Sequence, residues 1–303
     1  MRFTDKQPKA ANMSYAKSIE NGFKIDFEKN VPVKPNFIGS ETFTNYPLET
    51  LVEYFDWTPF FISWSLAGKF PKILEDEVVG EAARDLYEQA QIMLKDIIEN
   101  KRFDARATFS IYPANRTAAD TVAVTDESGN VTHTFEHIRQ QSDKVTGKAN
   151  YSLADFIAPK DVAQDYLGGF TVSIFGAEEM SQEYKANGDD YNAILVQALG
   201  DRFAEAFAEH LHQRIRKEFW GYQASETLNN DDLIKEHENF YNSLSGGVVL
   251  NNYCSVVSTV EPECDVLLKV AKSDINNTIE NNDQQFDLSA LQGMFGGTQG
   301  IIP

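Results

Sequence analysis

Apolar residues recur along this chain with two different periods, which predicts a mixture of helices and strands. Steps of three and four residues over 76–100 and 190–220 predict two long amphipathic helices. Alternation over 105–111, 121–135 and 169–175 predicts strands, two of which form a hairpin around a Gly-containing turn. Because helices alternate with hairpins rather than with single parallel strands, the expected fold class is α+β, a twisted antiparallel sheet with long helices.

The same pattern divides the chain into three parts. Residues 1–46 are expected to form an extended arm, since prolines interrupt any helix and residues 23–27 alternate as in a short strand. Residues 47–236 carry the strongly periodic segments and are expected to form the core of the fold. Residues 237–303 are poor in aromatic residues and end in a Gly-rich run, which predicts a weakly structured tail.

Composition narrows the class of function. The 303 residues carry a net charge of -19, which argues against a nucleic-acid partner, since binding a phosphate backbone requires clustered Lys and Arg. No apolar run approaches the ~20 residues of a membrane span, and the N-terminus lacks the apolar region of a secretory signal. The two cysteines, Cys254 and Cys264, are too few for a disulfide scaffold. The cytoplasm is the expected compartment.

Motif searches give no metal or nucleotide site. The chain lacks a G-x-G-x-x-G fingerprint, a P-loop, an HExxH motif and a nucleophile elbow. His210 and His212 lie on the second long helix, but residues two apart point to different faces, so a core or surface histidine is favoured over a metal ligand.

Two acidic residues attract attention for different reasons. Asp56 stands in a run crowded with aromatic residues, where a carboxylate is costly unless it is bonded. It is either the N-cap of a helix that begins near Pro59 or an acid that binds a cationic ligand, and the residues leave both open. Glu205 shares a helix face with Glu209, and a solvated surface with Arg202 nearby is the favoured interpretation on the residues alone.

Seven segments resemble the C-terminal activation domain of cobalamin-dependent methionine synthase, in that family's order, over residues 30–236. They are YFDWTPFFISWSLAGKFPKILEDEVVGEAA at 54–83, IYPANR at 111–116, HIRQQSDK at 137–144, ANYSLADFIAPK at 149–160, DYLGGFTVS at 165–173, DDYNAILVQALGDRFAEAFAEHLHQRIRKEFWGY at 189–222 and NNDDLIKE at 229–236. Because so many long matches occur in order, the chain is identified as a member of this family.

The resemblance implies a specific function. In that family the cobalamin occasionally oxidises to an inert cob(II)alamin state. The activation domain then binds S-adenosylmethionine and presents its methyl group to the cobalt, while a flavodoxin-type or related reductase supplies an electron. The resemblance implies that Asp56, in DWTPFF, contacts the amino group of this ligand, and that Glu205, in AEAFAE, lies near the same site. The implied partners are the reductase and the cobalamin-binding part of methionine synthase.

One departure from the family bears on ligand binding. After LIKE at 233–236 the family continues with an R-x-x-x-G-Y-P segment whose arginine grips the ligand carboxylate. This chain instead reads HENFYNSLSGGVV, and no arginine follows Arg216. A carboxylate without a guanidinium partner loses a charge-assisted and often bidentate contact. The expectation is therefore that this chain by itself binds S-adenosylmethionine weakly or not at all.

The leading hypothesis is an activation module of methionine biosynthesis that is part of a methyltransferase but not catalytically self-sufficient. The chain lacks a zinc-thiolate site, a folate barrel and a D-x-H-x-x-G cobalamin loop, and no residue is expected to act as nucleophile or general base. Two alternatives stay open. One is a non-catalytic docking scaffold with a defective ligand site, and the other is a truncated gene product whose last residues are not native to the fold.

Overall fold

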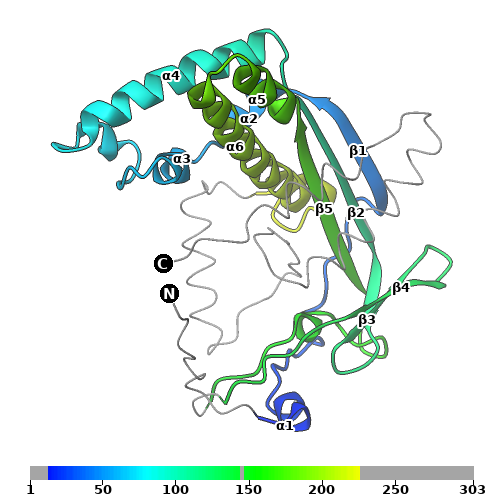
Figure 1. Cartoon of the computed structure of the whole chain (residues 1–303). Helices are drawn as coiled ribbons and strands as arrows, with labels where there is room; N and C mark the ends of the chain where they lie inside the picture. The colour runs from blue at the N-terminus through cyan, green and yellow to red at the C-terminus, as the bar shows by residue number, and fades with distance from the viewer. Residues whose placement is uncertain (1–12, 144–146, 226–303) are drawn as a thin grey trace. The chain divides into compact units, whose positions relative to one another are not determined.

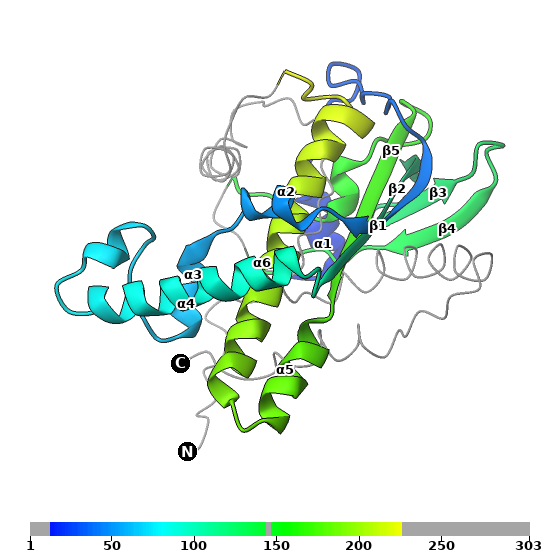
Figure 2. The same cartoon turned by 90° about the horizontal axis from the view of Figure 1, so that it is seen from above.

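The computed structural model describes residues 13–143 and 147–225, and Figures 1 and 2 show their elements from two directions. The helices are α1 (Tyr15–Glu20), α2 (Leu48–Val52), α3 (Trp57–Ser63), α4 (Gly80–Glu99), α5 (Ala177–Ala186) and α6 (Asp190–Arg214). The strands are β1 (Gly39–Tyr46), β2 (Asp104–Arg116), β3 (Thr121–Thr125), β4 (Val131–Glu136) and β5 (Asp165–Phe175). Three short turns complete the list: the 3-10 turns η1 (Lys72–Glu75) and η2 (Leu153–Phe156), and the π-helical turn η3 (Ile215–Phe219).

The strands form one five-stranded sheet. Its order is β1-β2-β3-β4, with β5 also paired to β2 (Figure 1). The pairs β2–β3 and β3–β4 are antiparallel, and Val124 lies opposite Ala114 on one side and His133 on the other. The predicted hairpin is closed by Asp126, whose Oδ1 accepts the backbone N–H groups of Ser128 and Asn130 at 2.9 and 2.8 Å. Together with α4 and α6, this sheet confirms the predicted α+β class with long helices.

The described residues fall into two compact units. Unit 1 takes residues 13–40, 110–143, 147–169 and 215–225, and unit 2 takes residues 41–109 and 170–214. The boundaries fall within β1, β2 and β5 and between α6 and η3. The division into an arm, a core and a tail stays a prediction, and its tail, residues 237–303, lies outside the described residues.

Unit 2 is built on the two long helices. The helical period places their apolar residues on one side, and these side chains are buried, which supplies the hydrophobic driving force for packing α4 and α3 against α6. The buried positions are Leu86, Ala90, Met93, Leu94 and Ile97 on α4, and Leu195, Leu199, Phe203, Phe207 and Leu211 on α6. Both predicted helices are therefore confirmed, with α6 continuing into η3.

Helix α5 was not predicted from the sequence. It follows Gly176, whose backbone has a φ of 95°. A Cβ atom at this position would stand 2.2 Å from the carbonyl oxygen of Arg102, so only glycine fits both the conformation and the space. Asn187, Gly188 and Asp189 then turn the chain, and α5 packs against α6. The signal in the sequence was Gly176 followed by the acidic pair Glu178 and Glu179 in the first turn.

Unit 1 has a smaller apolar core beneath the hairpin. It consists of Ala114, Val122, Val124, Phe135, Ala154, Ile157 and Leu167. The strand expected over residues 23–27 is wrong, since only Gly22 forms a bridge, to Asn150. The apolar alternation there reflects ring packing instead, because Phe23 lies 5.3 Å from Tyr151 and 5.7 Å from Phe156 between ring centroids. Before it, α1 is a short helix capped by the side chain of Ser14.

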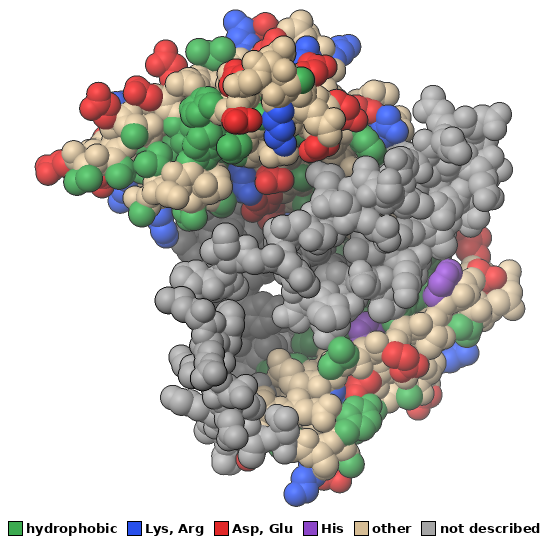
Figure 3. Space-filling view, viewed as in Figure 1, with side chains coloured by type: hydrophobic (Ala, Val, Ile, Leu, Met, Phe, Trp, Pro, Cys, Tyr) green, Lys and Arg blue, Asp and Glu red, His purple; other side chains and the backbone are tan. Residues whose placement is uncertain are grey.

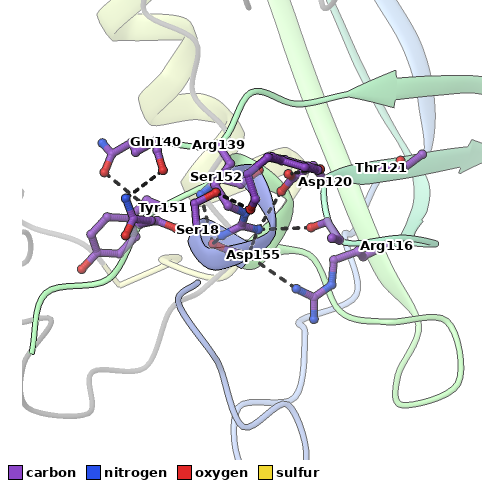
Figure 4. Close-up of polar contacts among 12 residues, drawn as sticks. Ser18, Arg116, Asp120, Thr121, Arg139, Gln140, Tyr151, Ser152 and Asp155 are labelled. Atoms are coloured by element: carbon purple, nitrogen blue, oxygen red, sulfur yellow. Dashed lines mark hydrogen bonds and ion pairs between the residues drawn. The ribbon is translucent and has the colours of Figure 1, made fainter. Parts of the chain in front are cut away.

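A buried ionic cluster holds the parts of unit 1 together, as Figure 4 shows. The guanidinium of Arg139 donates to both carboxylate oxygens of Asp155, at 2.8 and 2.6 Å, and lies 2.6 Å from Oδ1 of Asp120. Tyr15 of α1 donates its hydroxyl to the other oxygen of Asp120 at 2.7 Å. Burial acts to raise the pKa of Asp120, but the hydrogen bonds from Tyr15 and Arg139 outweigh it and hold that pKa below its usual value.

Candidate functional site

Asp56 stands at the start of α3 in unit 2. Its Oδ1 accepts the backbone N–H of Thr58 at 2.8 Å, so it is the N-cap of this helix. Pro59 occupies the first turn, where its missing N–H costs nothing. The side chain is exposed. The cap that the sequence offered as one of two roles is therefore present, and it occupies one carboxylate oxygen.

The aromatic residues around Asp56 pack against one another rather than against its carboxylate. Trp57 is 7% exposed, and its ring meets Phe60 and Tyr87 edge to face at 5.3 and 4.9 Å. Phe70 lies 5.3 Å from Tyr87, so the segment after α3 folds back onto α4. These ring contacts hold α3 and the segment that follows it against α4. The side chain of Asp56 is exposed, so its carboxylate is not desolvated by the aromatic residues that surround it in the sequence.

Phe55 connects this turn to α6. Its ring packs edge to face on Phe203 at 4.8 Å and lies 5.5 Å from Trp57. Because Phe203 is fully buried on α6, this contact fixes the start of α3 against that helix. The sequence did not single out Phe203 as a positioning residue, although its place in the apolar stripe of α6 marked it as core.

Glu205 lies on the exposed side of α6, two residues after Phe203. Its side chain is 46% exposed and forms an i,i+3 ion pair with Arg202, as its surroundings in the sequence suggested. No hydrogen bond or ion pair joins Glu205 to Asp56. The structure therefore places both predicted acids in unit 2, Asp56 at the start of α3 and Glu205 on α6, and the side chains of both are exposed.

The histidines have structural partners. His210 Nε2 lies 2.8 Å from the hydroxyl of Tyr46, and the ring of Tyr54 packs on it at 4.8 Å. His212 is 6% exposed and stacks on Phe170. Within residues 13–143 and 147–225, no group of three or more His, Cys, Asp or Glu side chains is placed to hold a metal ion. In the same part of the chain, no helix is both long and apolar enough to cross a bilayer.

The two exposed carboxylates can take part in binding a cation. Two exposed carboxylates on fixed helices attract positive charge, and a ligand ammonium group donates strong, charge-assisted hydrogen bonds to such oxygens. The Asp56 carboxylate can accept one of these bonds at Oδ2 while Oδ1 keeps its bond to Thr58. The carboxylate of Asp56 can therefore bind a compact cationic group without giving up its role as a helix cap.

Two comparisons identify relatives of this chain. Residues 47–242 match the sequence model of a family described as the activation domain of vitamin B12 dependent methionine synthase. A solved structure described as the crystal structure of the MetH reactivation domain bound to AdoHcy is 43% identical to this chain. It superposes with a TM-score of 0.71, and the match covers 75% of this chain and 70% of that one.

Proposed function

This chain belongs to the family of the activation domain of vitamin B12 dependent methionine synthase, and we propose that it binds S-adenosylmethionine through Asp56 and Glu205. The observation that carries the proposal is the geometry of Asp56. One carboxylate oxygen accepts the backbone N–H of Thr58 at the start of α3, and because the side chain is exposed, the other oxygen can accept a bond from a ligand. That the related structure is bound to AdoHcy, the demethylated product of S-adenosylmethionine, supports the same ligand class here.

The two acids have different tasks in this proposal. Asp56 accepts a hydrogen bond from the α-ammonium group of the ligand and so fixes its amino-acid end. Glu205 adds negative charge along α6, which favours a ligand that carries both an ammonium and a sulfonium group. Neither acid moves a proton in the reaction. Their work is to hold the S-methyl group in one orientation so that the acceptor meets it at a fixed distance.

The methyl acceptor belongs to a partner. Cobalamin bound to that partner would supply the cobalt that takes the methyl group, with an electron from a flavodoxin-type or related reductase. In this proposal the chain docks on the cobalamin-binding part of methionine synthase, and its sequence shows no D-x-H-x-x-G loop. Reductive remethylation in methionine biosynthesis, the two partners and a cytoplasmic location all belong to this proposal.

The test is calorimetric titration of the full chain with S-adenosylmethionine and with S-adenosylhomocysteine. The variant Asp56→Asn keeps an oxygen for the cap but loses the charge, so it separates the two roles of this residue. Loss of a charge-assisted bond worth about 1.5–3 kcal/mol predicts binding about 10- to 100-fold weaker. Asp76→Asn is the matched control, because Asp76 is an exposed acid of the same unit whose Oδ1 accepts the N–H groups of Val78 and Val79.

A second candidate function is a docking scaffold without ligand, favoured by the lack of any arginine after Arg216. The same titration decides between the two. Micromolar binding by the wild-type chain that is weakened by Asp56→Asn and not by Asp76→Asn supports the ligand site. No heat of binding at millimolar ligand rules it out and leaves the scaffold. Activation of a synthase lacking this domain, with the chain supplied in trans with reductant, then tests the reaction itself.

A further inference from the structure

The segment that carries Asp56 joins α2 to α3 and is attached to α6 at two places. Tyr54 donates its hydroxyl to Oε1 of Gln213 at 2.7 Å. Phe55, the next residue, packs edge to face on Phe203 with ring centroids 4.8 Å apart. Gln213 and Phe203 lie about 15 Å apart along the axis of α6. Two neighbouring residues therefore reach two separate points of one helix, and Asp56 follows them directly.

The ring and the backbone of Tyr54 are held as well as its hydroxyl. The ring packs on the imidazole of His210 with centroids 4.8 Å apart and an interplanar angle of 61°. His210 Nε2 in turn lies 2.8 Å from the hydroxyl of Tyr46, to which Arg214 donates at 3.2 Å. The backbone N–H of Tyr54 donates to the carbonyl oxygen of Leu51 in α2 at 3.0 Å. Because these contacts act on different parts of Tyr54, they favour a single rotamer and hold its segment at one distance from α6.

The position of Asp56 depends on this attachment. Its exposed carboxylate is bonded within its own turn, to the backbone N–H of Thr58. Two residues of chain keep the Cα atom of Asp56 within about 7 Å of that of Tyr54, so a shift of Tyr54 moves the carboxylate as well. Figure 3 shows acidic side chains spread over the surface around α3 and α4, so negative charge alone does not single out Asp56. A charge-assisted hydrogen bond to a ligand ammonium group also needs the carboxylate in one position.

The same two attachments relate Asp56 to the second proposed ligand acid. Glu205 lies on α6 between Phe203 and Gln213 in the sequence. Because α6 is one continuous helix, a segment attached at both places keeps Asp56 at a constant distance from Glu205. With the attachment at Gln213 lost, the segment gains freedom to move about the other. A ligand that contacts both acids then has to order the segment on binding, which costs affinity.

We propose that Tyr54 is a positioning residue for the ligand site. Through Gln213 and His210 it holds the second carboxylate oxygen of Asp56 where a ligand ammonium group can meet it. The inference rests on the proposed function and adds to it a residue that acts without a bond to the ligand. The effect of Tyr54 on affinity therefore passes entirely through Asp56.

The test is a double-mutant cycle between Tyr54 and Asp56, measured by calorimetric titration of the full chain with S-adenosylmethionine. Tyr54→Phe keeps the ring on His210 and removes the hydroxyl bond to Gln213, so it is expected to weaken binding about 2- to 10-fold. In the Asp56→Asn background the same change should have no further effect, since two changes that act through one group are not additive. A residue with a separate structural role would instead lower the affinity in both backgrounds.

Variants of Gln213 and Tyr15 complete the design. Gln213→Met removes the acceptor for the Tyr54 hydroxyl and should weaken binding as much as Tyr54→Phe does. Gln213→Glu restores an acceptor oxygen and should bind more tightly than Gln213→Met. Tyr15→Phe is the matched control, because its hydroxyl also donates to a side-chain oxygen at 2.7 Å, that of Asp120 in unit 1. Its loss should leave the affinity for S-adenosylmethionine unchanged.

A second measurement does not depend on the ligand. Hydrogen exchange of the Thr58 backbone N–H, which is bonded to Asp56, should be about 2- to 10-fold faster in Tyr54→Phe and unchanged in Tyr15→Phe. Unchanged exchange at Thr58 in Tyr54→Phe would overturn the inference whatever the affinities are. Far-UV circular dichroism of each variant shows that the fold is retained.

The outcomes separate this inference from the proposed function. If the wild-type chain binds S-adenosylmethionine and Tyr54→Phe binds it equally well, Tyr54 does not position Asp56 while the ligand site stands. An equal loss in the wild-type and Asp56→Asn backgrounds leads to the same conclusion. If the wild-type chain does not bind the ligand, the proposed function fails, and exchange at Thr58 decides by itself whether Tyr54 positions Asp56.

Discussion

Removing the charge of Arg139 provides the sharpest test of how unit 1 is held together. Arg139 and Asp155 each have side chains 2% exposed, and Asp120 is 5% exposed. Besides its carboxylate contacts, the guanidinium donates to the backbone carbonyl groups of Asn150 at 2.7 Å and Ala119 at 3.2 Å. Arg139→Met fills the same volume but leaves two buried carboxylates without their common cation, which is far costlier than losing the pair as a whole.

The expected magnitude follows from these contacts. Breaking one buried ion pair costs about 3–5 kcal/mol, and here two acids lose their partner, although Arg116 remains 3.6 Å from Asp155. The Arg139→Met variant should therefore lose about 4–5 kcal/mol of unfolding free energy at pH 7.5. Arg139→Lys keeps the charge but not the planar fork, and should lose about half as much.

The pH dependence distinguishes a charge effect from a packing effect. In the wild-type chain the pKa of Asp120 is held low, so its contribution to stability is present above the unfolded-state value and is lost as the pH falls through the folded-state value. In Arg139→Met the carboxylate of Asp120 loses its cation, so its pKa rises and it is protonated at a higher pH than in the wild-type chain. The gap between variant and wild type should therefore be smaller at pH 4.5 than at pH 7.5.

Urea unfolding followed by circular dichroism gives the free energies, and hydrogen exchange shows where the fold opens. Exchange should accelerate in residues 115–143 and 147–156 of unit 1 more than in α4 of unit 2. Lys29→Met, which removes an exposed partner of Asp26, is the control and should leave the urea midpoint unchanged. A loss below about 1 kcal/mol, or a loss equal at both pH values, would refute the assignment of Arg139 as the cation on which both acids depend.

Three further predictions test other parts of the fold. Gly176→Ala should destabilise the chain by more than about 3 kcal/mol, because its Cβ would strike the carbonyl oxygen of Arg102, whereas Gly129→Ala, also at positive φ but in open space, should lose about 1 kcal/mol in the same urea assay. Burial raises the pKa of Asp165 to about 6, so its stabilising contribution is full below about pH 4 and lost as the pH rises through 6. The penalty of Asp165→Asn relative to wild type should therefore shrink between pH 4.5 and 7.5, and a constant penalty would contradict this. Tyr15→Phe removes the hydroxyl that bonds Asp120 and should cost about 1–2 kcal/mol in thermal or urea unfolding, and no loss would show that α1 is held by other contacts.

The sequence alone predicted the features that depend on neighbours along the chain. The apolar periods of α4 and α6 predicted which side of each helix is buried. A helix in a folded protein places its apolar side toward the core, whichever elements form that core. The hairpin turn is equally local, and so is the cap at Asp56, which the sequence offered as one of two roles, since the bonds to Ser128 and Thr58 span two residues. The resemblance to the activation-domain family, carried by long segments in order, is confirmed as well.

The apolar pattern along the chain gave a wrong prediction where contacts between residues far apart in the sequence determine the structure. The alternation over residues 23–27 suggested a strand, but Phe23 packs against the rings of Tyr151 and Phe156, which lie more than a hundred residues later in the sequence. Nothing in the pattern showed that the aromatic residues around Asp56 would turn inward and leave its carboxylate in water. That arrangement depends on Tyr87 and Phe203, which come from two other helices.

What the sequence by itself determined is the family and the long helices, while it offered the cap at Asp56 as one of two roles. The tertiary structure decided that Arg139 joins Asp120 and Asp155, and that Trp64 at the end of α3 meets Tyr191 of α6. The physical reason is that a helical or strand period records which side of an element is buried, but not what lies against it. Charges and rings find their partners only when elements far apart in the chain pack together, as Tyr15 and Asp120 do across 105 residues.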